Sequence, residues 1–121
     1  MATRRILIVD DNEPLRALLR TYLVDAGYET VEASDGEAAI RLALFEQLDL
    51  VLLDVILPGR SGIYVLREIR LRRDIPVVLM STLGELEQID LADDADGYIR
   101  KPFRPKDVAE HVTAVLARKT R

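Results

Sequence analysis

Short apolar segments bounded by turn residues recur five times along the chain. They cover residues 6–9, 28–33, 50–53, 76–80 and 97–100. Runs of this length that end in Asp, Asn, Gly or Pro are typical of β-strands. The segment 28–33 gives a weaker signal because it carries Glu29 and Glu32. The unbroken apolar run 50–53 predicts a strand that is covered on both faces.

Helical patterns fill the stretches between these segments. In the first, apolar residues recur at helical spacing at Leu15, Leu18, Leu19, Tyr22, Leu23 and Ala26. Pro14 suits the first turn of that helix, and Gly27 is a stop signal after its last turn. The pair Ser34 and Glu37 is typical of a capping box, which predicts a second helix after Ser34. Further helices are predicted around residues 65–69 and from Pro105 onward.

The alternation of strands and helices predicts an α/β fold, in which a parallel sheet is covered by helices on both faces. Right-handed crossovers make such a sheet doubly wound. Residues 83–96 have the weakest pattern, with a short apolar stripe among acidic residues, so we expect a fourth helix that is short or irregular. The length of 121 residues fits a single domain, 1–121.

Polar residues whose side chains could take part in binding or catalysis follow four of the five predicted strands. They are Asp10 and Asp11 after the first, Asp54 after the third, Ser81 and Thr82 after the fourth, and Lys101 after the fifth. Parallel strands end at one edge of the sheet, and ligand sites of open α/β sheets lie in the crevice beyond that edge. We therefore expect these side chains to converge, although they are far apart in sequence.

Three neighbouring carboxylates repel one another and need a cation or a shared proton. A set of hard oxygen ligands without His or Cys favours Mg²⁺ or a similar ion such as Mn²⁺. A carboxylate can also serve as a nucleophile that forms an aspartyl phosphate. Together with Lys101 and Ser81, the acidic residues supply the groups needed to accept and stabilise a phosphoryl group.

Four stretches carry a resemblance to a known family: ILIVDDNEP, DLVLLDVILPGRSG, IPVVLMST and DGYIRKPF. Together, in this order, they resemble the receiver domain of two-component response regulators over nearly the whole chain. The resemblance implies a flavodoxin-like sheet of five parallel strands in the order 2-1-3-4-5, with five helices.

The resemblance also implies a role for individual residues. Asp54 matches the phosphoacceptor, and Asp10 and Asp11 match the acidic pair that holds Mg²⁺, with Asp54 and the backbone carbonyl of Ile56 as further ligands. Ser81 and Lys101 match the hydroxyl and the lysine that contact the phosphoryl group. Tyr98 matches the aromatic residue that turns inward with the switch, and the Lys101–Pro102 bond matches a cis peptide.

In function, the resemblance implies a cytoplasmic signalling receiver that takes a phosphoryl group from a sensor histidine kinase or phosphotransfer protein. Its own phosphotransfer and dephosphorylation are the only reactions expected of it. Phosphorylation would change the surface offered to an output domain or downstream protein. His111 stands where dimerising relatives carry an arginine, so we expect a monomer or a weak phosphorylation-dependent dimer. Because it lies off the apolar stripe of the last helix, His111 is also expected at the surface.

Composition narrows the alternatives. A net charge of −4 disfavours direct nucleic-acid binding, the absence of cysteine excludes disulfides, and no apolar run approaches the length of a membrane span. The first turn, DDNEP, lacks the glycines of a dinucleotide-binding domain. An aspartate-nucleophile phosphatase would carry a second aspartate two residues after the nucleophile, but this chain has Ile56 at that position, which disfavours such an enzyme. A scaffold that takes no phosphate remains open, as does a plain turn or helix-cap role for Asp10 and Asp11.

Overall fold

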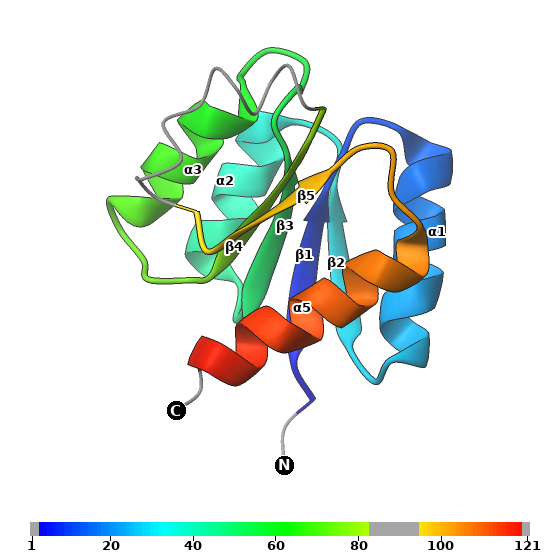
Figure 1. Cartoon of the computed structure of the whole chain (residues 1–121). Coiled ribbons are helices and arrows are strands. Elements are labelled where there is room, and N and C mark those ends of the chain that lie inside the picture. Colours follow the sequence, from blue (N-terminus) through cyan, green and yellow to red (C-terminus); the bar gives the residue numbers. More distant parts are fainter. Residues whose placement is uncertain (1–2, 83–94, 120–121) are drawn as a thin grey trace.

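The computed structural model describes residues 3–82 and 95–119, along which strands and helices alternate (Figure 1). The elements are β1 (Arg5–Val9), α1 (Glu13–Asp25), β2 (Glu29–Ala33), α2 (Gly36–Phe45), β3 (Leu50–Asp54), α3 (Gly62–Arg70), β4 (Val77–Ser81), β5 (Gly97–Arg100) and α5 (Pro105–Lys119). All five predicted strands are present. The predicted fourth helix falls largely on residues 83–94, which lie outside the described residues.

The strands form one parallel sheet in the order β2-β1-β3-β4-β5, which confirms the flavodoxin-like topology. Strand β1 has β2 on one side and β3 on the other, so the direction of winding reverses between β1 and β3. In register, Val9 at the end of β1 lies opposite Ala33 and Leu53. The residues that follow β1 and end β3 therefore emerge side by side at the carboxyl edge.

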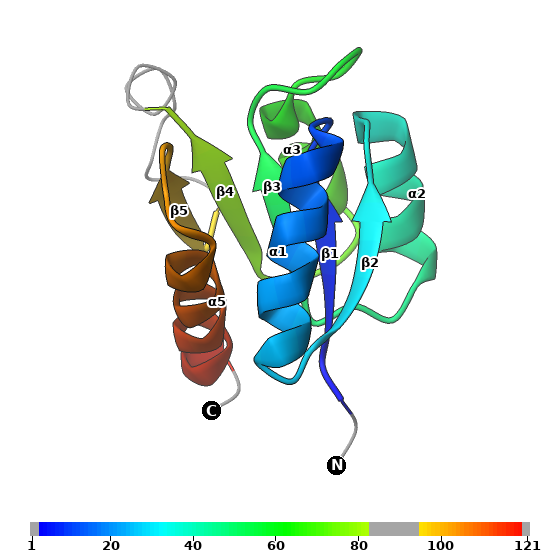
Figure 2. The same ribbon diagram turned by 90° about the vertical axis from the view of Figure 1, so that its right-hand side faces the viewer.

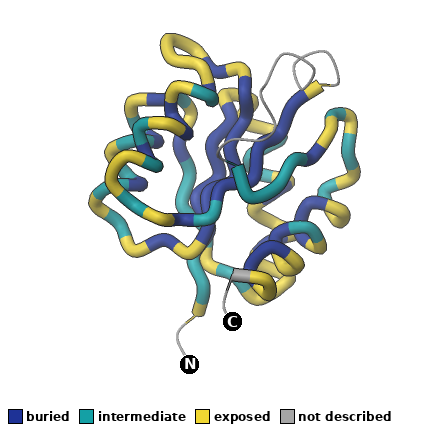
Figure 3. Tube along the Cα trace, turned by 60° about the vertical axis from the view of Figure 1, so that its left-hand side comes forward, coloured by how far each residue is buried: buried dark blue, intermediate teal, exposed yellow. Residues whose placement is uncertain are grey.

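Two apolar cores lie on the two faces of the sheet. Because side chains alternate along a strand, Ile6 and Ile8 pack with α1 and α5, whereas Leu7 and Val9 pack with α2 and α3. Figure 2 shows the two pairs of helices on opposite sides of the sheet. All four residues of the run 50–53 are 0% exposed, which confirms a strand covered on both faces. Figure 3 shows that the buried residues are concentrated in the central strands.

The helix ends follow local chemistry. Asn12 caps α1, since its side-chain oxygen accepts a hydrogen bond from the Leu15 amide at 3.0 Å. Gly27 follows the helix with a φ of 100°, as the stop signal predicts. The cap predicted at Ser34 was wrong by one residue. Asp35 is the N-cap of α2, because its carboxylate accepts the Ala38 amide at 2.9 Å.

The structure shows which apolar residues of α1 are buried, and it corrects the expected surface position of His111. On α1, Leu18 and Tyr22 are 45% and 39% exposed, while Leu19 and Leu23 form the buried stripe. His111 is half-buried rather than at the surface, because Gly97 leaves room for its ring: a Cβ at position 97 would lie 2.7 Å from His111 Nε2. The pKa of His111 is lowered, mainly by burial and to a smaller extent by the positive charge of Arg118. No helix in residues 3–82 and 95–119 is long and apolar enough to span a membrane.

A partly buried ion pair fixes the amino-terminal ends of β4 and β5. Asp96, immediately before β5, accepts hydrogen bonds from the Val77 amide at 2.8 Å and from the Arg70 guanidinium at the end of α3. Its side chain is 11% exposed. Arg118 on α5 donates to the Asp96 carbonyl at 3.3 Å. Asp96 thus links two strands and two helices at the amino edge of the sheet, opposite the edge where Asp10 and Asp54 lie.

Replacement of Asp96 by alanine is expected to lower the free energy of unfolding by about 1–3 kcal/mol, because the Val77 amide loses its acceptor in a buried setting. Equilibrium urea unfolding measures the change. Asp74→Ala removes an exposed carboxylate shortly before Val77 in the sequence and should change stability by less than about 0.5 kcal/mol. Equal losses for the two variants would contradict the assigned role of Asp96.

Candidate functional site

Three carboxylates gather at the carboxyl edge of the sheet. Asp10 follows β1, Asp11 is next to it, and Asp54 ends β3. One oxygen from each lies within 4.8 Å of the others. Asp10 and Asp54 are only 1% and 3% exposed, whereas Asp11 is exposed. The strand order produces this convergence, since β1 and β3 are neighbours at the point where the winding reverses.

Each buried carboxylate is oriented by its own loop. The Asn12 amide donates to Asp10 Oδ1 at 2.9 Å, and the Ile56 amide donates to Asp54 Oδ1 at 3.0 Å. In both cases the donor lies two residues after the aspartate, the geometry of an Asx turn. Rotation of each carboxylate is thereby restricted.

Lys101 brings a positive charge to the same place. Its Nζ lies 2.7 Å from Asp54 Oδ2 and 3.7 Å from Asp10 Oδ2, and its side chain is 27% exposed. The Lys101 amide donates to the Ser81 carbonyl at 2.7 Å, which anchors the residue to the end of β4. The Lys101–Pro102 peptide is cis, as the sequence resemblance predicted.

Burial dominates the electrostatics of Asp54. The pKa of Asp54 is raised from 3.8 to about 6, and loss of solvent is the largest cause. The hydrogen bonds from Lys101 and Ile56 oppose that rise, and the negative charge of Asp10 adds to it. Asp10 Oδ2 is buried and accepts no hydrogen bond from the described residues. The crevice is therefore short of positive charge even with Lys101 in place.

This donor set fits a hard divalent cation. Its members are carboxylate oxygens of Asp10, Asp11 and Asp54. One oxygen of Asp10, Oδ2, is buried and accepts no hydrogen bond within the described part of the chain. Mg²⁺ and Mn²⁺ prefer such ligands. Ile56 lies at the rim with its side chain 60% exposed. The use of its carbonyl as a ligand stays a prediction.

The remaining predicted residues lie on the neighbouring strands. Ser81 ends β4, is 0% exposed, and donates from Oγ to the Thr82 carbonyl at 3.4 Å. The preceding residue, Met80, is in register with Asp54. Tyr98 is in β5 and packs, partly buried, against the core on the side of α2 and α3. The switch roles of Ser81 and Tyr98 stay predictions.

A hollow of about 440 Å³ opens beside Lys101. It is lined by Asn12, Leu15, Thr82, Lys101, Pro102 and Phe103. The hollow therefore lies between the start of α1 and the loop after β5. Lys101 lines it and also contacts Asp54, so the lysine connects the buried carboxylate to an accessible surface.

The sequence analysis overlooked Gly62. This residue starts α3 and packs on the backbone of Asp54 and Val55, so a Cβ would lie 2.1 Å from the Asp54 carbonyl oxygen. The Gly62 amide donates to the Val55 carbonyl at 2.7 Å. A glycine in the loop after a candidate nucleophile was the available signal, because close backbone approach is a common reason for glycine.

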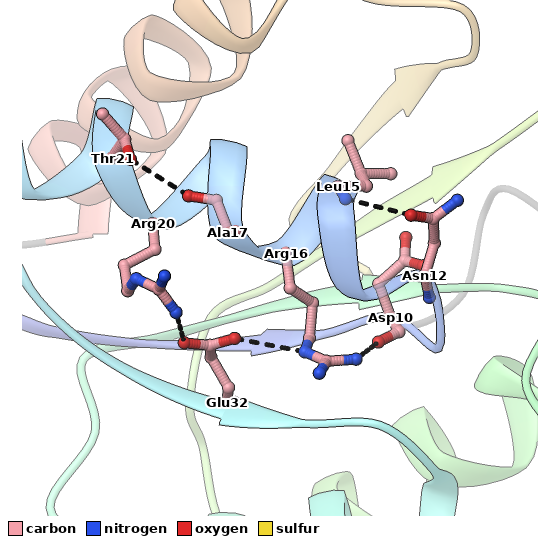
Figure 4. A network of polar contacts seen from close by, with 8 residues as sticks. All are labelled: Asp10, Asn12, Leu15, Arg16, Ala17, Arg20, Thr21 and Glu32. Atoms are coloured by element: carbon pink, nitrogen blue, oxygen red, sulfur yellow. Dashed lines mark hydrogen bonds and ion pairs between the residues drawn. The ribbon is translucent and has the colours of Figure 1, made fainter.

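Arg16 and Glu32 were also overlooked. Arg16 Nη1 donates to the Asp10 carbonyl at 2.7 Å, and Arg16 Nε donates to Glu32 Oε1 at 3.1 Å (Figure 4). The signal was the glutamate inside the second predicted strand. In the sequence, Glu32 indicates only a weaker strand signal for residues 28–33.

The sheet order and the helices on both faces define a flavodoxin-like α/β protein, here with an acidic crevice at the switch point of the strand order. Residues 6–113 match the family model described as the response regulator receiver domain. The chain belongs to this family, whose members act in two-component signalling.

Among known proteins, the chain is 40% identical over 116 residues to a probable transcriptional regulator, ycf27, of Guillardia theta, with 94% of this chain and 46% of that protein covered. It is 40% identical over 120 residues to the phosphate regulon transcriptional regulatory protein PhoB of Escherichia coli K12, with 95% and 52% covered. The chain thus spans about half the length of these relatives.

Among solved structures, the receiver domain of the sensor histidine kinase PA1611 from Pseudomonas aeruginosa PAO1 matches with a TM-score of 0.87 and 26% identity. The match covers 96% of this chain and 99% of that one. That structure has a magnesium ion coordinated in its active site cleft.

Gly62→Ala is expected to destabilise the protein by about 3 kcal/mol, because the added methyl group meets backbone atoms that cannot move aside independently. Urea unfolding without metal measures the loss. Gly59→Asn is the control in the same loop: Gly59 has a φ of 81° and open space around it, and asparagine tolerates this conformation, so the loss should stay below about 1 kcal/mol. A tolerated Gly62→Ala would show that the loop can shift away from Asp54.

Asp54→Asn is expected to make the metal-free protein more stable at pH 7, by about 1–3 kcal/mol, because a buried carboxylate with a raised pKa is replaced by a neutral group. The native pKa of about 6 exceeds the unfolded value of 3.8, so ionised Asp54 lowers stability above that window. Well below pH 3.8 both states hold the proton, and the two proteins should converge. Urea unfolding at about pH 3 and at pH 7 with a chelator measures both differences. A difference independent of pH would be inconsistent with the raised pKa.

Proposed function

We propose that this chain is a phosphorylation-switched receiver that accepts a phosphoryl group on Asp54 with Mg²⁺, or Mn²⁺, as cofactor. The observation that carries the proposal is the contact between Lys101 Nζ and Asp54 Oδ2, beside a buried oxygen of Asp10 that accepts no hydrogen bond from the described residues. A nucleophile, a cation held beside it and a second buried carboxylate thus occupy one crevice. Family membership supports the same conclusion.

Asp54 is the nucleophile of the proposed reaction. An oxygen of its carboxylate forms a bond to phosphorus as the phosphorus–nitrogen bond of a phosphohistidine breaks, and the electron pair of that bond stays on the imidazole. The donor is a sensor histidine kinase or phosphotransfer protein, and a small acyl phosphate can replace it. With a pKa of about 6, Asp54 is mostly ionised at neutral pH and so is competent to attack.

Asp10, Asp11, Asp54 and the Ile56 carbonyl would hold the metal ion. When bound, Mg²⁺ offsets charge on the oxygens of the transferred group. Lys101 holds one oxygen of Asp54 through a charge-assisted hydrogen bond and supplies a second positive group. The amides of Asn12 and Ile56 keep both buried carboxylates oriented while this occurs.

Ser81 and Lys101 would sense the new charge. A phosphoryl group adds roughly −1.5 to −2 charges, which attracts the Ser81 hydroxyl and the Lys101 ammonium. Their main chains are joined by a hydrogen bond, so both respond at the ends of β4 and β5. Tyr98 in β5 would turn inward as Ser81 moves. This biases the surface offered by β5 and α5 toward a second state. Hydrolysis of the acyl phosphate restores the first.

In the cell, we expect residues 1–121 to act as one receiver domain in the cytoplasm. Its relatives are described as transcriptional regulators, which favours an output domain or a downstream partner in gene control. Direct contact with nucleic acid would then fall to the output part. The receiver would be a monomer or a weak dimer that forms on phosphorylation.

Incubation with a small acyl-phosphate donor and Mg²⁺ is expected to label the wild-type protein, with the label lost on treatment with hydroxylamine. Asp54→Ala and the wild type in excess chelator should take up no label, because the nucleophile or the metal is missing. Asp74→Asn, an exposed carboxylate outside the crevice, should be labelled normally. Intact-protein mass spectrometry measures each result.

Two outcomes would refute the proposal. A folded wild-type protein that takes up no label from either a small donor or a phosphorylated kinase would indicate a receiver-like scaffold. Sustained release of phosphate from external phosphoesters, lost in Asp54→Ala, would indicate a phosphatase.

A further inference from the structure

A polar brace lies behind the acidic pair. It consists of Arg16 and Arg20 on α1 and Glu32 on β2 (Figure 4). Arg16 makes two contacts with one guanidinium: Nη1 donates to the Asp10 carbonyl at 2.7 Å, and Nε donates to Glu32 Oε1 at 3.1 Å. Glu32 also accepts from Arg20 Nη1 at 2.5 Å. The brace therefore ties the start of α1 to the end of β1 and to the edge strand.

Its members differ in their exposure to water. The side chain of Arg16 is 14% exposed and that of Glu32 is 26% exposed, whereas Arg20 is 47% exposed. Charge-assisted hydrogen bonds are stronger when shielded, and exposed ion pairs contribute little. The contacts of Arg16 are thus the strong part of the brace, and Arg20 supports Glu32 from the solvent side.

The brace acts on the backbone of Asp10. The Asp10 amide donates to the Ala33 carbonyl at 3.2 Å, its carbonyl accepts from Arg16, and its Oδ1 accepts from the Asn12 amide. The peptide that joins Asp10 to Asp11 is therefore held through its own carbonyl oxygen. Rotation of this peptide would move the exposed carboxylate of Asp11 relative to the buried one of Asp10.

We propose that Arg16, supported by Glu32, is a positioning residue for the divalent cation site: it fixes the Asp10–Asp11 peptide so that both carboxylates face the same point. The inference rests on the proposed function for the metal itself. Outer contacts that orient metal ligands commonly change metal affinity 10- to 100-fold when they are removed.

Arg16→Lys tests this role without changing the net charge. A lysine ammonium is a single point on a flexible chain, so it lacks the planar fork with which arginine bridges the Asp10 carbonyl and Glu32. A neutral replacement would be less informative, because removal of a positive charge by itself favours cation binding. Arg20→Lys is the matched control, since Arg20 contacts Glu32 without reaching Asp10.

The experiment is a Mg²⁺ titration of each folded protein, followed through the amide NMR signals of Asp11 and Asn12. The dissociation constant for Mg²⁺ is expected to rise about tenfold in Arg16→Lys and to change less than about twofold in Arg20→Lys. The Asn12 amide signal of Arg16→Lys should already be displaced in the metal-free protein, because this amide reports on the Asp10 turn. Thermal unfolding in chelator measures any loss of stability separately.

A purely structural brace would lower thermal stability in Arg16→Lys and leave the dissociation constant within twofold of wild type, which would overturn the inference. Should Arg16→Lys not fold, Glu32→Asp decides, because it keeps the charge but shortens the side chain that holds Arg16. At least a threefold weaker affinity is expected, and unchanged affinity would refute the role. A wild-type protein that binds no Mg²⁺ would refute both this inference and the metal part of the proposed function. Normal wild-type binding with unaffected variants refutes the brace alone.

Discussion

The burial of the Asp54 carboxylate is the constraint on which the rest of the site depends. Asp54 ends a strand whose other residues are fully buried, so its side chain emerges where little water reaches it. An isolated charge in that position is unfavourable, and the raised pKa expresses that penalty. The Ile56 amide and the Lys101 ammonium both reduce it. The same loss of water strengthens any interaction that Asp54 makes with a cation or a phosphoryl group.

Much of the fold could be predicted because parallel strands have a simple signature. The apolar runs predict five strands, and the common direction of these strands predicts that Asp10, Asp54 and Lys101 lie at one edge, as the structure shows. The contacts that depend on three-dimensional register could not be read in this way. The approach of Arg16 to a backbone carbonyl, the packing of Gly62 on Asp54 and the half-burial of His111 beside Gly97 each join residues that no local pattern connects. The choice of Asp35 over Ser34 as a cap shows the same limit at short range, because both residues are good caps and only the backbone decides.

Strand β5 is held differently at its two ends. At its amino end, Asp96 binds the Val77 amide and Arg70, which secures the strand to β4 and α3. At its carboxyl end, the chain continues into Lys101, whose side chain is held by the carboxylates of the crevice and whose amide bonds to Ser81. A change of charge at Asp54 therefore acts on the carboxyl end of β5. The amino end of β5 is fixed by contacts that do not involve the site. This asymmetry fits a switch whose effect is carried along β5 to α5.

The distribution of positive charge explains why the crevice keeps an excess of negative charge. Arg16 lies next to Asp10, yet its guanidinium donates to the carbonyl of that residue and pairs with Glu32. Had it bound the Asp10 carboxylate instead, the oxygen that now lacks a hydrogen bond would be satisfied and the site would be closer to neutral. Glu32 therefore directs Arg16 away from the carboxylates, and Arg20 reinforces this by holding Glu32. The metal-free protein retains unfavourable repulsion between the carboxylates of the crevice. A bound divalent cation would relieve that repulsion, which is the physical reason to expect that metal binding and the stability of the domain are coupled.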